Sequence, residues 1–206
     1  MKLGLISDVH EQIEPLQFAL ERFRRDPVDQ IVFLGDLFEM GEHLLQATQT
    51  LHQASVIGVW GNHDFGLTRL GLNDEVRSRF PAEALQYTQT LQPFLRIEDC
   101  HFSHVEPWRN PERLEDLWSY DRLPTEPASA ARSFAATDAR VIFLGHLHRF
   151  AAVSDQGPPL VWRGEAPLQL HAGQRYVVII AAVCDALCAM YDTSTGWLTP
   201  IDLSRD

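Results

Sequence analysis

Short apolar runs alternate with longer amphipathic runs in the first sixty residues. Residues 2–7 (KLGLIS), 30–35 (QIVFLG) and 55–60 (SVIGVW) are rich in β-branched residues and nearly continuous in apolar side chains, which is typical of strands buried on both faces. Between them, residues 15–25 and 41–53 carry apolar side chains at helical spacing. This βαβαβ order predicts parallel strands in one sheet.

The pattern changes after residue 60. Residues 106–127 form a polar, proline-containing stretch that we expect to be a long loop. From residue 150 onward, short apolar runs punctuated by glycine and proline predict an antiparallel sheet. The remaining expected elements are helices at 73–79, 82–91 and 128–136 and strands at 94–97, 101–104 and 140–145.

The length, composition and net charge of the chain indicate its domain organisation and the partners it is expected to bind. A chain of 206 residues fits a single domain, residues 1–206, and a content of 45% hydrophobic and 22% charged residues is that of an ordinary globular protein. The formal net charge of −11 argues against broad attraction to nucleic-acid phosphates. Nucleic acid is therefore not an expected partner.

The cysteines and the hydropathy of the chain indicate the cellular compartment in which the protein is expected. Cys100, Cys184 and Cys188 are odd in number and form no CxxC pair, so neither a disulfide framework nor a zinc knuckle is indicated. The apolar run at the N-terminus is too short for a signal peptide, and no run approaches the roughly 20 apolar residues of a spanning helix. We expect a cytoplasmic protein without membrane association, and the sequence does not indicate an oligomeric state.

Polar side chains recur where the apolar strands end. In an open α/β sheet the carboxyl ends of the strands form the crevice in which ligands bind, so these side chains are expected to converge. Oxygen and imidazole donors suit Mn²⁺, Fe, Ni²⁺ or Zn²⁺. Their number exceeds the needs of one ion, which favours two ions sharing a carboxylate. The candidate ligands are Asp8, His10, Asp36, Asn62, His104, His146 and His148, with His63 in addition.

The polar motifs at the strand ends are Asp8-Val9-His10, Gly35-Asp36, Gly61-Asn62-His63-Asp64, the isolated His104 and Gly145-His146-Leu147-His148. In this order they resemble the motifs of the calcineurin-like metallophosphoesterases. The chain is similar to the small bacterial members over residues 1 to about 150 and more loosely beyond. The resemblance implies an α/β (α+β) fold, a four-layer αββα sandwich in which two mixed β-sheets are flanked by helices, of the metallo-dependent phosphatase type. It also implies a dinuclear centre in which Asp8, His10 and His148 hold the first ion, Asn62, His104 and His146 hold the second, and Asp36 bridges the two.

The residue types suit hydrolysis of a phosphate ester. A bridging carboxylate sets two cations about 3.5–4 Å apart, so that a shared water becomes a hydroxide nucleophile near neutral pH. Asn62 supplies an oxygen ligand without negative charge. His63 is predicted to be the general acid for the leaving group, and Glu39 is predicted to fix its tautomer and favour its protonated form. We expect Asn62, His63 and His104 to contact the substrate as well.

Two positions depart from the family pattern. Met40 follows Glu39 where protein phosphatases of this family usually place a phosphate-gripping arginine, and Arg149 or Arg109 are the candidate substitutes. Residues 179–182 read Ile-Ile-Ala-Ala, where small bacterial relatives typically form an Asn-Pro-Gly turn. Either that turn is rebuilt in this chain, or the edge of the substrate is bound differently.

Several polar and aromatic residues have both structural and functional interpretations. Asp64 either supports a ligand or caps the following helix, and the cap is favoured. Trp60 is predicted to be a core residue. Trp108 and Trp118 either border the substrate or pack the 106–127 stretch, and a lid is favoured because long irregular loops are often functional. Four further histidines are predicted to be solvated loop residues: His43, His52, His101 and His171.

Two functions of different class follow from the sequence. The first is a metal-dependent hydrolase, with Mn²⁺ as the preferred ion, that acts on a small phosphomonoester or phosphodiester. The second is a non-catalytic metal-binding scaffold of the same fold that recruits a partner protein. A scaffold would be free to lose its general acid, and His63 is present with all seven candidate ligands, so the enzyme is favoured.

Overall fold

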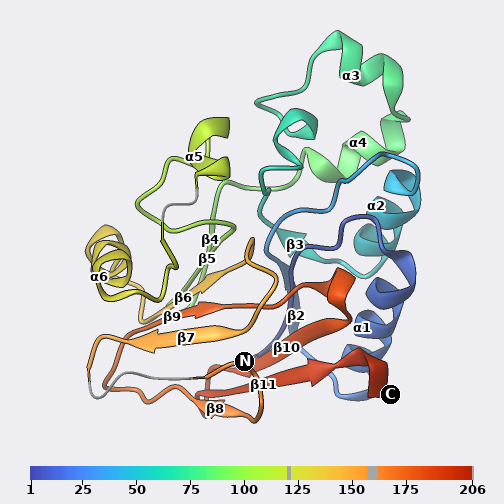
Figure 1. Ribbon diagram of the computed structural model, residues 1–206. Helices are drawn as coiled ribbons and strands as arrows, with labels where there is room; N and C mark the ends of the chain where they lie inside the picture. The colour runs from blue at the N-terminus through green and yellow to red at the C-terminus, as the bar shows by residue number, and fades with distance from the viewer. Residues whose placement is uncertain (120–121, 157–161, 206) are drawn as a thin grey trace.

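Two β-sheets lie face to face between helices in the computed structural model, which describes residues 1–119, 122–156 and 162–205 (Figure 1). The first sheet has the strand order β3-β2-β1-β10-β11-β8. β1 pairs in parallel with β2, and β2 pairs in parallel with β3. Its strands are β1 (Lys2–Ile6), β2 (Gln30–Phe33), β3 (Ile57–Gly58), β8 (Leu168–Gln169), β10 (Leu187–Asp192) and β11 (Trp197–Asp202).

The second sheet has the order β4-β5-β6-β9-β7. β5, β6 and β9 run parallel to one another, whereas the edge strands β4 and β7 are antiparallel to their neighbours. Both sheets are therefore mixed, as the resemblance implied. The strands are β4 (Leu95–Ile97), β5 (Cys100–Ser103), β6 (Val141–Leu144), β7 (Ala151–Ser154) and β9 (Tyr176–Ile179).

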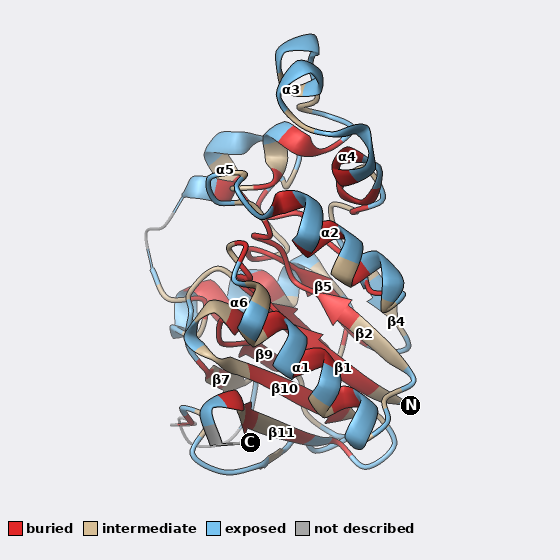
Figure 2. Ribbon diagram, turned by 90° about the vertical axis from the view of Figure 1, so that its right-hand side faces the viewer, coloured by how far each residue is buried: buried red, intermediate tan, exposed pale blue. Residues whose placement is uncertain are grey.

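Helices cover the outer faces of both sheets. α1 and α2 pack on the first sheet and α6 packs on the second, which gives four layers (Figure 1). In Figure 2 these helices turn exposed residues outward, while central strands such as β1, β9 and β10 are mostly buried. The helices are α1 (Ile13–Arg25), α2 (Leu44–Gln53), α3 (Asp74–Arg79), α4 (Ala82–Thr88), α5 (Leu114–Trp118) and α6 (Pro127–Ala136), with 3₁₀ turns η1 (Phe65–Leu67), η2 (Val183–Asp185) and η3 (Leu203–Arg205).

Side chains from both sheets fill the central layer. Leu3 and Leu5 of β1 point between the sheets, whereas Ile6 joins the cluster beneath α1 and α2. Across the layer, the rings of Phe143 on β6 and Tyr191 on β10 lie 5.2 Å apart between centroids. Trp60 is fully buried beneath the helices, which confirms its prediction as a core residue. In the described ranges, no helix is both long and apolar enough to cross a bilayer.

The C-terminal strands correct one prediction. An antiparallel sheet was expected after residue 150, but these strands are divided between the two sheets. β9 enters the second sheet parallel to β6, while β10 pairs antiparallel with β1 and extends the first sheet. The alternation of apolar runs and turns specified strands, but it could not specify which existing edge each strand would complete.

Asp64 ties together the turns that follow β2 and β3. Its two carboxylate oxygens accept four backbone N–H bonds, from Asp36 (2.8 Å), Leu37 (2.8 Å), Phe38 (3.0 Å) and Gly61 (2.9 Å). The carboxylate is fully buried and makes no capping bond to η1. The favoured interpretation of Asp64 as a helix cap is therefore wrong, and its carboxylate instead supports the backbone of the two turns that carry the candidate ligands Asp36 and Asn62.

Replacing Asp64 by asparagine tests this support. The new side-chain amide would turn a donor toward N–H groups that need an acceptor, so D64N is expected to lower the free energy of unfolding by about 2–4 kcal/mol. Urea denaturation followed by circular dichroism measures the change. D74N is the matched control, because Asp74 is exposed, and its effect is expected to stay below about 0.5 kcal/mol. Equal stability of the two variants would contradict the role given to Asp64.

Candidate metal centre

The predicted ligands follow the carboxyl ends of strands in both sheets and gather in one place. Asp8 and His10 follow β1, Asp36 follows β2, and Asn62 follows β3 in the first sheet. His104 follows β5, and His146 and His148 follow β6 in the second. The ligands thus reach one centre from both sheets, between the ends of β1, β2, β5 and β6.

One group of potential ligand atoms comprises Asp8, His10 and His148. The Nε2 atoms of His10 and His148 lie 3.3 Å apart, and His148 Nε2 lies 3.4 Å from Asp8 Oδ1. Asp8 is fully buried, and its other oxygen accepts bonds from Ser7 Oγ and from the backbone N–H of His146 (3.1 Å). This group can hold one cation.

A second group comprises Asp36, His104 and His146, and Asn62 adjoins it. His104 Nε2 lies 2.9 Å from Asn62 Oδ1 and 3.2 Å from His146 Nδ1. His104 Nδ1 lies 2.7 Å from the carbonyl oxygen of Leu34. That contact makes Nδ1 the protonated nitrogen and leaves the Nε2 lone pair for a metal.

Asp36 lies between the two groups. Its Oδ2 is 3.3 Å from His104 Nε2 and 3.9 Å from His10 Nε2. Its Oδ1 accepts the backbone N–H of His63 at 3.0 Å, so the carboxylate is held from one side while Oδ2 faces imidazoles of both groups. A carboxylate in this position can serve two cations.

The electrostatics of these groups favour positive charge. Burial raises the pKa of Asp36, but attraction to His104 and hydrogen bonds from His104 and the backbone outweigh it and hold the pKa well below its usual range. Burial lowers the pKa of His104, yet the Asp36 carboxylate raises it to about 9. The Asp8 carboxylate, whose Oδ1 lies 3.4 Å from His148 Nε2, raises the pKa of His148 to about 10. Burial and the neighbouring His104 instead lower the pKa of His146 to about 4, so the carboxylates favour positive charge at His104 and His148 in particular.

The donor atoms fit divalent cations. Asp8 Oδ1 is buried and accepts no hydrogen bond from the described residues, which is costly for a carboxylate oxygen unless a cation faces it. Its neighbours are imidazole nitrogens and a second carboxylate, the donor set of Mn²⁺, Fe, Ni²⁺ and Zn²⁺. These residues therefore suit a resident metal.

The backbone is strained at several candidate ligands. Five of the nine non-glycine residues with positive φ in the described chain are candidate ligands, and left-handed backbone is uncommon for such residues. Strain of this kind concentrates at sites where the direction of a side chain matters more than stability. The five are Asp8 (φ 50°), His10 (φ 44°), Asp36 (φ 62°), His146 (φ 72°) and His148 (φ 48°).

His63 and Glu39 lie at the edge of the two groups of candidate ligands. Glu39 Oε2 is 2.9 Å from His10 Nδ1 and 3.5 Å from His63 Nδ1. The carboxylate therefore faces both imidazoles and makes its shorter contact with the candidate ligand His10. The rings of His10 and His63 meet edge to face, with centroids 4.8 Å apart.

Glu11 holds the loop that carries Glu39, and sequence reasoning missed it. Its carboxylate is buried and accepts backbone N–H bonds from Glu39 (3.1 Å), Gly41 (2.7 Å) and His43 (2.9 Å). The position of Glu11 one residue after His10 was the only signal available, because a glutamate in a loop is ordinarily solvated.

An open pocket of about 570 Å³ is lined by residues of both groups of candidate ligands. We call it the metal pocket. Trp118 of α5 forms part of its wall, with its ring 5.2 Å from that of His63. Trp108, the other tryptophan considered as a substrate contact, lies outside this pocket and packs between Arg109 and Arg132. The lining residues are His10, Gln12, Asp36, Glu39, Asn62, His63, Trp118, His146, His148 and Cys184.

Neither candidate for the missing arginine lies in this pocket. Arg109 is buried and pairs with Glu106 at 2.7 Å. Arg149 is exposed and lines a neighbouring pocket that shares His148 as a wall. Met40, at the position of the family arginine, is 68% exposed.

The Ile-Ile-Ala-Ala segment begins at the end of β9 and is followed by η2. It is fully buried and leads into η2, whose Val183 and Cys184 donate backbone bonds to the carbonyl oxygens of Ser7 (2.8 Å) and Asp8 (3.1 Å). The turn brings Cys184 Sγ to 3.7 Å and Asp185 Oδ2 to 3.5 Å from His148 Nδ1. Sequence reasoning gave neither residue a role.

The four histidines predicted to be solvated separate into two kinds. His43, His52 and His171 are exposed, as expected. His101 is buried on β5 and stacks on Phe94, so its prediction was wrong. Burial lowers the pKa of His101 to about 4. The neutral ring serves as a packing residue.

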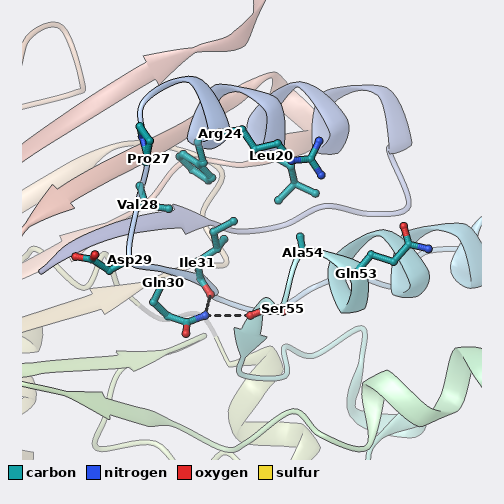
Figure 3. Close-up of a pocket in the computed structure, with 11 residues that line it drawn as sticks. Leu20, Arg24, Pro27, Val28, Asp29, Gln30, Ile31, Gln53, Ala54 and Ser55 are labelled. Atoms are coloured by element: carbon teal, nitrogen blue, oxygen red, sulfur yellow. Dashed lines mark hydrogen bonds between the residues drawn. The ribbon is translucent and has the colours of Figure 1, made fainter.

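Another pocket lies at the opposite ends of the strands and contains none of the candidate ligands. It has a volume of about 380 Å³ and lies between the last turns of α1 and α2 (Figure 3). Arg24 and Gln30 line it, and Gln30 Nε2 donates to the carbonyl oxygen of Ser55 at 3.1 Å. Because it lies away from the candidate ligands, a substitution in this pocket can serve as a control for substitutions near them.

Comparisons with curated proteins give relatives with and without a described activity. An uncharacterized protein of Methanocaldococcus jannaschii is 23% identical over 200 residues, which cover 85% of this chain and 73% of the relative. Symmetrical bis(5′-nucleosyl)-tetraphosphatases of Pseudomonas syringae and Actinobacillus succinogenes are 35% identical over 79 residues and 31% identical over 116. Those two matches cover 37% and 50% of this chain but only 26% and 42% of the relatives.

Solved structures share the fold. A metallophosphoesterase from Sphaerobacter thermophilus superposes with a TM-score of 0.76 at 23% identity, covering 97% of this chain and 86% of that one. An archaeal phosphodiesterase superposes with a TM-score of 0.57 at 15% identity, covering 98% and 99% of the two chains. At these identities the likeness establishes the architecture alone.

The model of the calcineurin-like phosphoesterase superfamily domain matches residues 1–185. That range contains all seven candidate ligands together with His63 and Glu39. The chain therefore belongs to the calcineurin-like phosphoesterase superfamily and is, as a member, a metal-dependent hydrolase of phosphoric esters.

Proposed function

We propose that the protein is a dinuclear phosphoesterase. Asp8, His10 and His148 would hold one divalent ion, His104, His146 and Asn62 would hold the other, and the Asp36 carboxylate would serve both. The observation that carries this proposal is the position of Asp36 Oδ2, which faces a nitrogen of each group, His104 Nε2 at 3.3 Å and His10 Nε2 at 3.9 Å. Mn²⁺ is the expected ion, with Fe, Ni²⁺ and Zn²⁺ as alternatives.

The ions and the protein have separate tasks. When bound, two such ions neutralise the phosphate and lower the pKa of a shared water so that it supplies hydroxide near neutral pH. Asn62 and His104 orient the phosphate from the side of the second group. The glutamate beside His10 and the carbonyl beside His104 fix the tautomers of those ligands.

His63 acts as the general acid. Hydrolysis replaces the bond between phosphorus and the leaving oxygen with a bond to a water oxygen, and the leaving oxygen keeps the bonding electron pair and needs a proton. His63 donates the Nε2 proton to that oxygen, while its Nδ1 faces Glu39 at 3.5 Å. The ring of Trp118 beside His63 gives the leaving group an apolar surface.

The substrate is a small phosphate ester. Two relatives are named symmetrical bis(5′-nucleosyl)-tetraphosphatases, which supports a nucleotide as the esterified group. The pocket is open to solvent, and its lining carries two carboxylates, Asp36 and Glu39, with no lysine or arginine among the described residues. Phosphate recognition within this pocket therefore depends on the bound ions.

The alternative function is a metal-binding scaffold without catalysis. Reloading with Mn²⁺ after treatment with a chelator separates the two functions. The enzyme is expected to regain hydrolysis of p-nitrophenyl phosphate or of bis(p-nitrophenyl) phosphate, and the preferred ester distinguishes a monoesterase from a diesterase. Recovery of metal without hydrolysis of either ester would favour the scaffold.

Removing the bridge tests the dinuclear arrangement. D36N keeps the size of the side chain but removes the negative charge shared by two cations, so it is expected to lose most of the bound Mn²⁺ and to lower kcat/KM by at least about 100-fold. Metal content is measured by elemental analysis after gel filtration, with D74N as the control. Two equivalents of Mn²⁺ in D36N would refute the bridging role.

Replacing His63 tests proton donation. H63A is expected to retain its metal but to lower kcat for alkyl phosphate esters by about 10²- to 10⁴-fold. The loss is expected to be smaller for p-nitrophenyl esters, because p-nitrophenolate is stable without a proton. A Brønsted plot of kcat against the pKa of the leaving group measures the difference. An unchanged slope would remove His63 from this role.

A further inference from the structure

A second pocket adjoins the metal pocket and shares His148 with it. Its volume is about 640 Å³, within the usual range for small-ligand sites. Arg149, which directly follows the shared histidine, lines it together with Arg163. The described lining is Leu123, Thr125, His148, Arg149, Phe150, Ala151, Ala152, Trp162, Arg163 and Leu187.

This pocket has the opposite charge to the rest of the molecule. Its described lining contains two arginines and no carboxylate, in a chain whose formal net charge is −11. Both arginines are exposed. Two acids lie nearby: Asp185 Oδ2 is 3.5 Å from His148 Nδ1, and the Glu165 carboxylate accepts the backbone N–H of Arg163 at 2.9 Å. Two guanidinium groups in one pocket suit a phosphate group, which each can bind with paired N–H donors.

The remaining wall is apolar. Phe150 and Trp162 pack against each other with ring centroids 5.4 Å apart, and the Trp162 indole N–H donates to the carbonyl oxygen of Ala166 at 2.8 Å. Leu123 and Leu187 are half-buried at the same pocket. An anionic group attached to an apolar, planar moiety would match both parts of the lining.

A row of contacting rings runs from the predicted general acid to the residue shared by the two pockets. The ring of Trp118 contacts His63, the ring of His63 contacts His10, and the ring of His10 contacts His148. The leaving group departs toward the acid His63, near Trp118. The ester group that stays on phosphorus lies off the line between the attacking and leaving oxygens, so it can extend toward His148, where the arginine-lined pocket begins.

We propose that the arginine-lined pocket binds a second phosphate on the retained side of the substrate, together with the nucleoside attached to it. This inference rests on the proposed function, since it uses His63 to define the leaving side. The scissile phosphate then carries a phosphoanhydride-linked nucleotide, and Arg149 and Arg163 determine specificity for it. These two arginines also supply the anion recognition that the metal pocket lacks beside Met40.

Two substrates with the same leaving group isolate the retained side. Bis(p-nitrophenyl) phosphate and the β-p-nitrophenyl ester of a nucleoside 5′-diphosphate both release p-nitrophenol, but only the second retains a further phosphate and a nucleoside. R149Q and R163Q are each expected to lower the ratio of kcat/KM for the nucleotide ester to that for the diester by about 10- to 100-fold, mainly through KM. R24Q is the matched control, because exposed Arg24 lines the distant pocket of Figure 3.

Binding supplies a readout independent of turnover. Calorimetry with α,β-methylene adenosine diphosphate is expected to show about 10- to 100-fold weaker binding to R149Q and R163Q than to R24Q or to the unaltered protein. Unchanged ratios and unchanged binding in both arginine variants would overturn the proposal while leaving the phosphoesterase intact. Failure of the Mn²⁺-loaded, unaltered protein to release p-nitrophenol from either substrate would instead overturn the proposed function, and the second-phosphate site with it.

Discussion

Buried carboxylates at the carboxyl ends of the strands are the constraint on which the site depends. Asp8, Asp36 and Asp64 are all almost completely shielded from water, and an unpaired buried charge is strongly unfavourable. Asp64 is satisfied entirely by backbone N–H groups, so its task is to hold two turns together. Asp8 and Asp36 instead direct oxygen atoms toward imidazoles. The fold thus neutralises one carboxylate itself and presents the other two to cations.

The same arrangement explains why strain is tolerated at the ligands. A left-handed backbone at a non-glycine residue costs on the order of 1–3 kcal/mol, and several ligands adopt it. Backbone bonds offset that cost, since Asp8 and Val9 donate to the carbonyl oxygens of Gly35 and Asp36, each at 2.8 Å. The turns after β1 and β2 therefore stabilise one another. The direction of a candidate ligand's side chain therefore depends on backbone hydrogen bonds to the turn after the neighbouring strand. The rigidity of the site depends on the same bonds between the two turns.

The sequence predicted what local pattern and chemistry can encode. The first three strands and two helices follow from apolar spacing, and the candidate ligands follow from polar residues at strand ends. The partners of β9 and β10 do not, because an apolar run carries no record of which sheet edge is vacant. Asp64 was misassigned because a cap and a buried clamp share the same sequence signal. Trp118 and Trp108 could not be ranked either, since only the three-dimensional path of residues 106–127 places one beside His63 and the other between arginines.

Overall charge and local charge have separate consequences for recognition. A net charge of −11 repels extended polyanions, whose affinity grows with the number of phosphates neutralised by basic residues. A small phosphate compound experiences mainly the charges within a Debye length of about 8–10 Å. Within that range, cations held by Asp8 and Asp36 and the guanidinium groups of Arg149 and Arg163 would both attract it. An acidic protein can thereby select a compact oligophosphate over a nucleic acid without any contact that reads a base.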